Sequence, residues 1–375
     1  MTEALTAITM PKWGLTMTEG KVLRWLKPPG ASFAPGEELL EIETSKITNA
    51  VEAEWSATLL RVVAAEGTTL PIGALLAVTG PADASSAEIN EFVSGFIVVE
   101  PTDEGPSGSQ VPAPSEMEIA GTRLRYLERG GGSATPVLLV HGFGADLNSW
   151  MFTQPALCEN RPVIALDLPG HGGSSRNVGT GDIHAQSDTV AAFISGVGLS
   201  AVHLVGHSMG AAIAAMAAAR HADKVGAVTL IAPAGLGPEI NSGFIEGFIR
   251  ATRRREATDV LRMLVHEPAL ISRAMVEDVL RFKRLDGVPA ALETIANAWF
   301  RNGRQQYSIG SEIASLRGPV QVIWGREDRI IPVSHAASVP PGVAVHTLGD
   351  TGHLPHLEKA SEVNRLIRQL LDGAG

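Results

Sequence analysis

The pentapeptide Gly206-His207-Ser208-Met209-Gly210 joins a run of apolar residues to a run rich in alanine. The first run, residues 202–206, has the length of a buried strand, and the second, residues 209–221, has that of a helix. A serine between two glycines at such a junction can occupy a sharp, strained turn, because neither glycine brings a Cβ atom into the crowded backbone. The start of the helix also favours negative charge developing at an acyl oxygen. The segment therefore predicts a nucleophile elbow with Ser208 as the nucleophile.

Strand-length apolar runs alternate with helical stretches on both sides of this elbow. Alternation of this kind predicts a parallel sheet covered by helices on both faces, as in α/β domains. The predicted strands are residues 137–140, 163–167, 202–206, 225–231, 320–324 and 343–348, and a last helix is predicted over residues 358–371.

An acid and a histidine follow the late strands in the order of a serine triad. Asp328 comes just after one strand, and His353 comes after the last strand and before the last helix. In such a triad the histidine deprotonates the serine and the acid orients the imidazole. Together with Ser208, these residues resemble the α/β-hydrolase family in motif and chain order, and the resemblance covers residues 116–375. It implies that Ser208, Asp328 and His353 are catalytic.

Other side chains compete for some of these roles. Glu327 and Asp350 are alternatives to Asp328 as the acid, although Asp328 has the position that the family uses. His207 and His356 are interpreted as packing or hydrogen-bonding residues. Cys158 is expected at the buried end of a helix.

The same resemblance implies an oxyanion site. His141-Gly142-Phe143-Gly144 follows the first long strand and matches the oxyanion loop of the family. The backbone N–H groups of Phe143 and Met209 would then bind the oxyanion, and each donor contributes about 3–4 kcal/mol. The hexapeptide Asp167-Leu168-Pro169-Gly170-His171-Gly172 is a further family signature and is interpreted as structural, as is His141.

The N-terminal part of the chain contains an internal repeat. Val22-Leu23-Arg24-Trp25, Gly30 and Gly36-Glu37-Glu38-Leu39-Leu40 recur as Leu59-Leu60-Arg61-Val62, Gly67 and Gly73-Ala74-Leu75-Leu76, offset by 37 positions, as from Leu23 to Leu60. Each half has short alternating apolar runs separated by turn signals, which predicts two small sheets related by a pseudo-twofold axis. Lys46 falls between the strand-like residues 39–43 and 47–52, so we expect it at the tip of a hairpin.

Residues 6–79 resemble a lipoyl domain, the carrier of 2-oxoacid dehydrogenase complexes. Met10-Pro11-Lys12-Trp13-Gly14 corresponds to the opening of that domain, and Lys46 corresponds to its lipoylated residue. In one departure from the pattern, Ala57 stands where a turn glycine is common. The resemblance implies an all-β carrier with lipoate attached to Lys46; the plainer alternative is an ordinary solvated lysine in a hairpin.

The neighbours of the lysine distinguish between two carrier types. Biotinyl domains share this fold but have Met on both sides of the lysine, whereas Ser45 and Ile47 flank Lys46 here. Lipoate is therefore favoured over biotin. Ser45 also stands where the lipoyl family usually has Asp, which bears on the partner that recognises the hairpin.

The sequence predicts a multidomain chain with a linker between its two domains. Composition separates the parts, because the region between the domains is acidic and then rich in Pro, Gly and Ser. A helix at residues 87–99 of that region either docks on one of the domains or contacts a partner. The predicted parts are a lipoyl domain at residues 1–80, an acidic helix and linker at residues 81–115, and an α/β-hydrolase domain at residues 116–375 with a helical cap at about residues 239–312.

Composition argues against several function classes. With 375 residues, 45% of them hydrophobic, the chain can bury one small and one mid-sized core. The net charge is −10, of which −6 lies in residues 81–115, and nothing indicates binding to nucleic acid. The longest apolar run, residues 209–219, is far shorter than the roughly 20 residues that span a bilayer, and no signal segment is predicted. A single cysteine and the spacing of His, Asp and Glu predict no metal site. We expect a cytoplasmic protein.

The predicted cap is rich in arginine. Nine basic residues lie within residues 250–284, and the whole cap contains ten acids, so the plainer interpretation is a solvated face. The alternative is a surface that binds the phosphates of coenzyme A or the acidic carrier, because arginine binds phosphate through a bidentate fork. The nine basic residues are Arg250, Arg253, Arg254, Arg255, Arg262, Arg273, Arg281, Lys283 and Arg284.

A lipoyl carrier fused to a hydrolase fold resembles the acetyltransferase component of acetoin dehydrogenase complexes. The resemblance implies transfer of acetyl from S-acetyldihydrolipoyl-Lys46 to coenzyme A through an acyl-enzyme on Ser208. It also implies two partners, a thiamine-dependent dehydrogenase that loads the carrier and a flavoprotein dihydrolipoyl dehydrogenase that reoxidises it. The sequence does not decide whether the chain forms homo-oligomers. One alternative is a hydrolase (an esterase, thioesterase or C–C hydrolase) that its lipoyl carrier localises. Another is a non-enzymatic scaffold, against which the complete triad argues.

Overall fold

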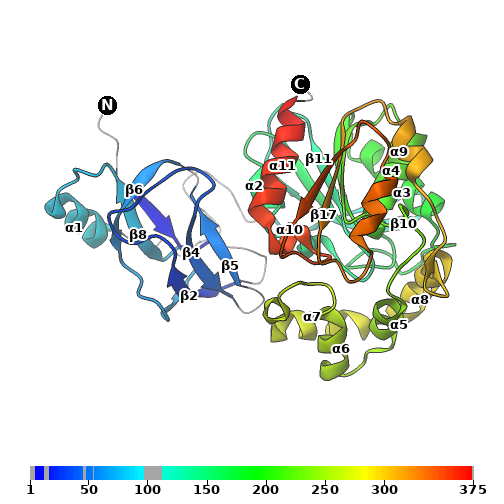
Figure 1. The fold of residues 1–375 in the computed structure, drawn as a ribbon, viewed down its shortest axis with the longest axis horizontal. Coiled ribbons are helices and arrows are strands. Elements are labelled where there is room, and N and C mark those ends of the chain that lie inside the picture. The colour runs from blue at the N-terminus through cyan, green and yellow to red at the C-terminus, as the bar shows by residue number, and fades with distance from the viewer. Residues whose placement is uncertain (1–4, 12–16, 45–47, 54, 97–111, 374–375) are drawn as a thin grey trace. The chain divides into compact units, whose positions relative to one another are not determined.

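The computed structural model describes residues 5–11, 17–44, 48–53, 55–96 and 112–373. The chain divides near residue 112 into two compact units (Figure 1). The N-terminal unit is formed by two β-sheets with one helix, and the second unit is an α/β domain. The predicted fold class, a lipoyl-type domain followed by an α/β-hydrolase fold, is confirmed.

Two four-stranded antiparallel sheets form the N-terminal unit, in the strand orders β1-β8-β6-β3 and β5-β4-β2-β7. Moving β2, β3 and β4 along the chain by 37 positions brings them onto β6, β7 and β8, as from Glu38 to Leu75. The two sheets therefore have equivalent strand orders, as the repeat predicted. The strands are β1 (Thr6–Thr9), β2 (Glu19–Trp25), β3 (Ser32–Phe33), β4 (Glu38–Glu43), β5 (Thr48–Glu52), β6 (Ala57–Val62), β7 (Thr69–Pro71) and β8 (Leu75–Gly80).

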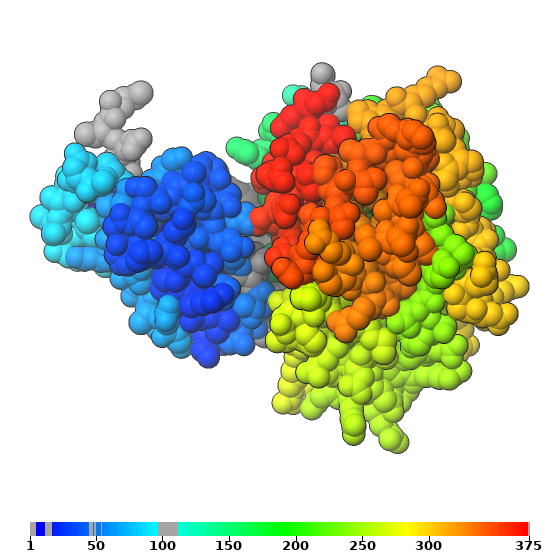
Figure 2. Space-filling model, viewed as in Figure 1, coloured from blue at the N-terminus to red at the C-terminus, as the bar shows by residue number. Residues whose placement is uncertain are grey.

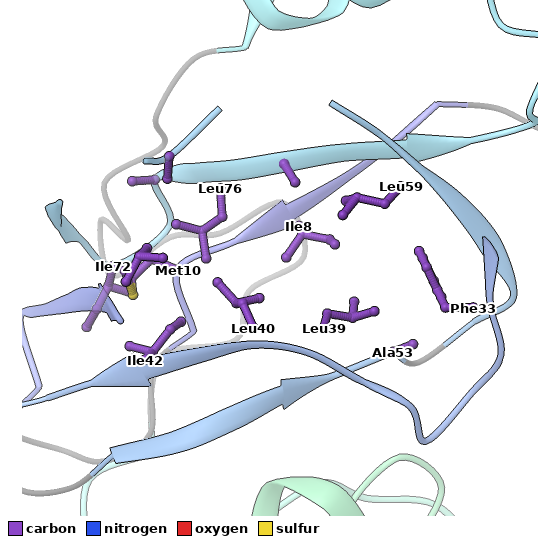
Figure 3. Packing of buried hydrophobic residues seen from close by; sticks show 14 of the residues in the cluster. Ile8, Met10, Phe33, Leu39, Leu40, Ile42, Ala53, Leu59, Ile72 and Leu76 are labelled. Carbon is purple, nitrogen blue, oxygen red and sulfur yellow. The ribbon is translucent and has the colours of Figure 1, made fainter. Parts of the chain in front are cut away.

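The core of this unit lies between its two sheets (Figure 3). Ile8 and Leu76 from one sheet lie opposite Leu40 and Ile42 from the other, and all four side chains are buried. Full burial of a side chain of this size stabilises the fold by roughly 1.5–3 kcal/mol. Alternation of apolar residues along short strands thus builds a small core.

Helix α1 (Ser86–Gly95) packs on the N-terminal unit. Its start is fixed by a capping box, in which Ser85 and Glu88 bind each other's backbone N–H groups. Ile89 is buried, and Asn90 accepts a hydrogen bond of 2.6 Å from Arg61 of β6. The first of the two interpretations of this helix, docking on a domain, is thus observed, while residues 97–99 of the predicted helix lie outside the described residues.

An eight-stranded sheet forms the centre of the second unit, in the order β18-β17-β14-β13-β11-β12-β10-β9. All six predicted strands are present and pair in parallel, but β9 and β10 add an antiparallel edge that was not predicted. The strands are β9 (Ser115–Ile119), β10 (Thr122–Arg129), β11 (Val137–Val140), β12 (Val163–Leu166), β13 (Val202–His207), β14 (Val225–Ile231), β17 (Val320–Gly325) and β18 (Ala344–Leu348).

Helices cover both faces of this sheet (Figure 1). The last predicted helix is in fact two helices that break at Lys359, so the prediction of one helix over residues 358–371 was wrong in its start. The longer of the two lies at the surface, red in Figure 2, and buries Val363, Leu366 and Ile367, an amphipathic spacing. The helices are α2 (Gln154–Leu157), α3 (Ile183–Gly196), α4 (Met209–Arg220), α9 (Gly310–Ser315), α10 (Pro355–Glu358) and α11 (Ala360–Gly373), with 3₁₀ turns η1 (Leu147–Trp150) and η3 (Val333–Ser338).

The chain leaves the sheet between β14 and β17 to form the cap. Besides the predicted helices, the cap contains a two-stranded hairpin, β15 (Phe300–Arg301) and β16 (Arg304–Gln305), which the sequence analysis missed. Asn302 and Gly303 join the two strands with φ of +52° and +67°, and Asn-Gly is the pair that favours such a turn. The cap helices are α5 (Ser242–Arg250), α6 (Arg254–Leu261), α7 (Arg273–Lys283) and α8 (Val288–Trp299), with a 3₁₀ turn η2 (Pro268–Leu270).

Candidate active site

Ser208 lies in a tight turn between β13 and α4. Its φ is +55°, and its N–H donates to the carbonyl of Ile231 at 2.9 Å. The glycines on either side allow this turn: a Cβ atom on Gly206 would lie 2.4 Å from the carbonyl oxygen of Gly210, and one on Gly210 would lie 2.3 Å from that of His141. The backbone is therefore crowded in the way the elbow motif predicted.

The structure brings the three predicted triad residues together. His353 Nε2 lies 2.9 Å from Ser208 Oγ, and His353 Nδ1 lies 2.7 Å from Asp328 Oδ2. The acid therefore fixes the ring so that Nε2 can accept the serine proton. The side chains of His353 and Asp328 are 3% and 0% exposed, so bulk water does not compete for these hydrogen bonds.

Both oxygens of Asp328 have further partners. Oδ1 accepts the backbone N–H groups of Ile330 and Ile331 at 2.8 and 3.0 Å, and Oδ2 accepts the indole N–H of Trp324 at 3.0 Å. These donors hold both oxygens of the carboxylate in place. No role for Trp324 was predicted, although it lies in β17, four residues before the acid.

Neither alternative acid binds the His353 ring. Glu327 Oε2 accepts the N–H of Thr351 at 2.9 Å, and the two residues also pair through their backbones. Asp350 has an exposed side chain, and its Oδ1 lies 3.9 Å from His266 Nε2. The geometry thus favours Asp328 for the third position.

Two backbone N–H groups near Ser208 are available to a ligand. Among the described residues, no protein acceptor is bound to the N–H of Met209, at the start of α4, or to that of Phe143. Both residues are buried. The α4 N-terminus adds a favourable field for an anion, so this pair of N–H groups suits an oxyanion.

Two buried histidines shape the loop that carries Phe143. His171 Nε2 accepts the N–H of Gly144 at 3.0 Å, and His141 Nε2 accepts the N–H of Leu168 at 3.0 Å. Burial lowers the pKa of both imidazoles, so they remain neutral and can accept these bonds. The loop at residues 141–144 and the signature at residues 167–172 are therefore tied to each other.

Aromatic rings from the cap cover the same loop. Phe143 makes edge-to-face contacts with Phe248 of α5 and Phe300, at centroid distances of 5.8 and 6.0 Å. A Cβ atom on Gly144 would lie 2.5 Å from the Phe248 ring, so only glycine permits this approach. The buried ammonium of Lys283 binds the Phe248 and Ala251 carbonyls at the end of α5.

The neighbouring histidines belong to the packing around the triad. His207 Nε2 donates to the carbonyl oxygen of His353 at 2.7 Å, and its ring stacks on His356, which in turn contacts Trp150. Burial lowers the pKa of His207 well below the usual value and that of His356 to about 3. Both are therefore neutral; His207 is held by a hydrogen bond and ring contacts, and His356 by ring contacts with His207 and Trp150.

The predicted modification site lies outside the described residues. The strands on either side of it, β4 and β5, pair antiparallel, with Glu43 opposite Thr48. Lys46 and its neighbours Ser45 and Ile47 are not among the described residues, nor are residues 12–14 of the predicted opening.

Several arginines of the cap form exposed ion pairs with neighbouring acids. Arg254 binds Glu277 at 2.9 Å, and Arg281 binds Asp278 at 3.0 Å. Within the part of the chain that the structure describes, no cluster of His, Cys, Asp and Glu could hold a metal ion. The helices described there also include none that is long and apolar enough to cross a membrane.

Comparison with known proteins supports both domains. Residues 135–360 match the family described as alpha/beta hydrolase fold, and residues 6–79 match the family described as biotin-requiring enzyme. A solved structure, the meta-cleavage product hydrolase of Pseudomonas fluorescens, covers 70% of this chain and 98% of its own, with a TM-score of 0.63. Its sequence identity is 22%, so it shows the fold alone.

Two curated relatives match over nearly the whole chain. Both are dihydrolipoyllysine-residue acetyltransferase components of an acetoin cleaving system. The one from Cupriavidus necator is 42% identical and covers 98% of this chain and 97% of its own. The one from Pseudomonas putida is 44% identical and covers 97% of this chain and 98% of its own. This chain therefore belongs to the family of dihydrolipoyllysine-residue acetyltransferase components of acetoin cleaving systems.

Proposed function

We propose that the chain transfers acetyl from a dihydrolipoyl arm on Lys46 to coenzyme A, through an acyl-enzyme on Ser208. The observation that carries this proposal is the continuous set of hydrogen bonds from Asp328 through His353 to Ser208, of 2.7 and 2.9 Å. The relatives of the chain are acetyltransferases, so this nucleophile has an acetyl donor.

The donor arm would be attached at Lys46. The match to the biotin and lipoyl carrier family over residues 6–79 and the pairing of β4 with β5 on either side of the lysine support this site. Lipoate attached there would supply, in its reduced form, a dithiol at the end of a long flexible arm, one sulfur of which can carry acetyl as a thioester.

Acylation of the serine follows from the triad geometry. Ser208 Oγ attacks the thioester carbonyl while His353 Nε2 takes the hydroxyl proton, and Asp328 stabilises the imidazolium that forms. The N–H groups of Met209 and Phe143 bind the oxyanion. When the C–S bond breaks, His353 returns the proton to the leaving thiolate, so the carrier leaves as a thiol and acetyl remains on the serine.

Transfer to coenzyme A repeats these steps in reverse. His353 takes the proton of the incoming thiol, the thiolate attacks the acetyl-serine carbonyl, and the C–Oγ bond breaks as the proton returns to Ser208. Water would compete at this stage. The cap rings of Phe248 and Phe300 over Phe143, and the 8% exposure of Ser208, support a site from which bulk water is largely excluded.

As a component of an acetoin cleaving system, the chain works within a set of enzymes. We propose that a thiamine-dependent dehydrogenase loads the carrier and that a flavoprotein dihydrolipoyl dehydrogenase reoxidises it. A cytoplasmic location remains a prediction from the sequence.

Substitution of the nucleophile tests the proposal. Ser208→Ala should lower acetyl transfer between dihydrolipoamide and coenzyme A by at least about 10³-fold, in both directions, with the fold unchanged. Ser195→Ala is the control, because that hydroxyl bonds only a carbonyl of its own helix, α3. Transfer at the wild-type rate by Ser208→Ala would exclude the acyl-enzyme route. Release of acetate by the wild type in place of acetyl-coenzyme A would favour a hydrolase.

A further inference from the structure

A half-buried carboxylate that the reaction does not use holds the turn of the triad histidine. Glu358 Oε1 accepts the N–H of Gly352 at 2.9 Å and faces the N–H of Leu354 at 3.4 Å. Its other oxygen accepts the N–H of His266, in the cap, at 2.6 Å. One side chain therefore binds backbone on both sides of His353 and connects it to the cap.

The histidine itself also contacts the cap directly. The N–H of His353 donates to the carbonyl of Leu264 at 2.7 Å. A Cβ atom on Gly352 would lie 2.8 Å from the Leu264 carbonyl oxygen and equally close to the His266 nitrogen. Only glycine lets the two backbones come this close, so the sequence before the histidine is suited to this contact.

The turn that carries Asp328 also binds this segment of the cap. Arg329, which follows Asp328, donates through its guanidinium to the carbonyl of Val265 and, at 3.3 Å, to that of Arg262. We call residues 262–266, between α6 and η2, the bridge segment. It is bound from the histidine turn by Glu358 and from the acid turn by Arg329.

We propose that the bridge segment is part of the scaffold of the triad, and that Glu358 is a positioning residue that keeps His353 within reach of both Ser208 and Asp328. The proposal rests on the assignment of catalysis to these three residues. Catalytic groups must be held to within about 0.5 Å of their working geometry. A displacement of about 1 Å can cost about 10²-fold in rate, even when the change is remote from the reacting atoms.

The bonding capacity of Glu358 makes its replacement informative. A carboxylate offers two accepting oxygens, one for the histidine turn and one for the bridge segment, whereas the glutamine amide offers one. Burial raises the pKa of Glu358, and the N–H groups of His266 and Gly352 counteract part of that effect.

Kinetics on the full-length lipoylated chain test the inference. Glu358→Gln should lower kcat for acetyl transfer about 10- to 100-fold while the KM values for dihydrolipoamide and coenzyme A change less than about 2-fold. The pKa that governs the pH profile of kcat/KM should also shift. Arg329→Met, which releases the bridge segment from the turn of Asp328, should also lower kcat with little change in the KM values. This variant replaces Glu358→Gln in the test if Glu358→Gln does not fold.

Asp182→Asn is the matched control. Asp182 also binds a backbone N–H, that of Ala185 at 2.9 Å, but at the start of α3 and away from the triad. It should lower the melting temperature without lowering kcat. Wild-type kcat in both Glu358→Gln and Arg329→Met would overturn the inference, as would equal kcat losses in these variants and in Asp182→Asn. Ser208→Ala is measured alongside: if it stays active, the triad assignment fails, whereas an inactive Ser208→Ala with active bridge variants rejects the bridge alone.

Discussion

The backbone of Ser208 has the left-handed φ of +55°, which costs a non-glycine residue on the order of 1–3 kcal/mol. The surrounding structure holds it there, because the Ser208 N–H is bound to Ile231 and the following helix starts at once. The strain presents Oγ to His353 and leaves the Met209 N–H free on the same side. The geometry of the site therefore costs stability at this one residue, and the hydrogen bonds and packing around it offset that cost.

Buried neutral histidines are a second feature at this scale. His203 lies in β13, fully buried, with Nε2 bound to the Thr229 hydroxyl at 2.8 Å, and burial lowers its pKa to about 3. In the unfolded chain its pKa is about 6.5. As the pH falls below about 6.5, the unfolded state therefore binds a proton that the native state does not, and the free energy of unfolding falls.

Replacing this histidine should weaken the dependence of the free energy of unfolding on pH in the acid range. Between about pH 6 and pH 4, wild type should lose about 1.4 kcal/mol of unfolding free energy per pH unit more than His203→Gln, since the variant lacks the titrating ring. Chemical denaturation at a series of pH values, followed by tryptophan fluorescence, measures both profiles. Parallel profiles would show that His203 is protonated in the native state or does not contribute.

At the scale of elements, the elbow depends on how closely β11, β13 and α4 approach. Gly210→Ala would place a Cβ atom 2.3 Å from the carbonyl oxygens of Val140 and His141, which are backbone atoms and cannot rotate away. We expect a loss of about 1–3 kcal/mol or more in stability, and loss of acetyl transfer as α4 shifts. Gly310→Ala, with open space around its Cβ position, should change stability by less than about 0.5 kcal/mol. Thermal unfolding compares the two, and equal effects would reject the packing argument.

Element prediction from the sequence succeeded for the central strands. β11 (Val137–Val140) and β14 (Val225–Ile231) have the predicted bounds, and β12 and β13 differ from them by one residue, because a mainly apolar run is stable in a sheet covered on both faces. β10 was missed: Thr122–Arg129 alternates charged and apolar residues and lies towards the sheet edge, where the hydrophobic signal is weak. The hairpin at Asn302 was missed because its strands have two residues each.

The candidate site also contains residues that could be predicted from the sequence and residues that could not. Side chains with recognisable chemistry, Ser208, Asp328 and His353, were named from motif and chain order, and the structure brings them within hydrogen-bond distance. The bridge segment was not predicted, because it contacts the site through its own backbone atoms, as when the Leu264 carbonyl accepts the His353 N–H. Such contacts leave no pattern in side-chain identity.

At the scale of the whole molecule, the carrier and the hydrolase-fold domain work through a linker. Because α1 packs on the N-terminal unit, the linker that remains before β9 consists of residues 96–114. A flexible chain of about 19 residues has an r.m.s. reach of about 22–26 Å, which would keep the arm near the second domain at an effective concentration on the order of mM. Separation of the domains should therefore reduce transfer from the attached arm without affecting the triad.

Limited proteolysis tests this separability. Cleavage is expected in the Pro-, Gly- and Ser-rich residues 104–114, before β9 begins at Ser115. The fragment of residues 116–375 should stay folded and keep its reactivity with small acetyl esters, while acetyl transfer from the separated carrier falls to the rate set by its bulk concentration. Mass spectrometry locates the cut and circular dichroism follows the fold; unfolding on cleavage would place the domain boundary elsewhere.

The central claim is that acetyl passes from Lys46 to Ser208 and then to coenzyme A. A single-turnover experiment tests it most directly: the lipoylated chain is acetylated on its arm, quenched at intervals and analysed by peptide mass, first without and then with coenzyme A. The account predicts that an acetyl group appears on Ser208, only in chains with a lipoylated Lys46, and that coenzyme A removes it as acetyl-coenzyme A faster than water releases acetate. Acetyl-coenzyme A formed at the full rate by Ser208→Ala, or an acetyl-serine that only water discharges, would contradict it.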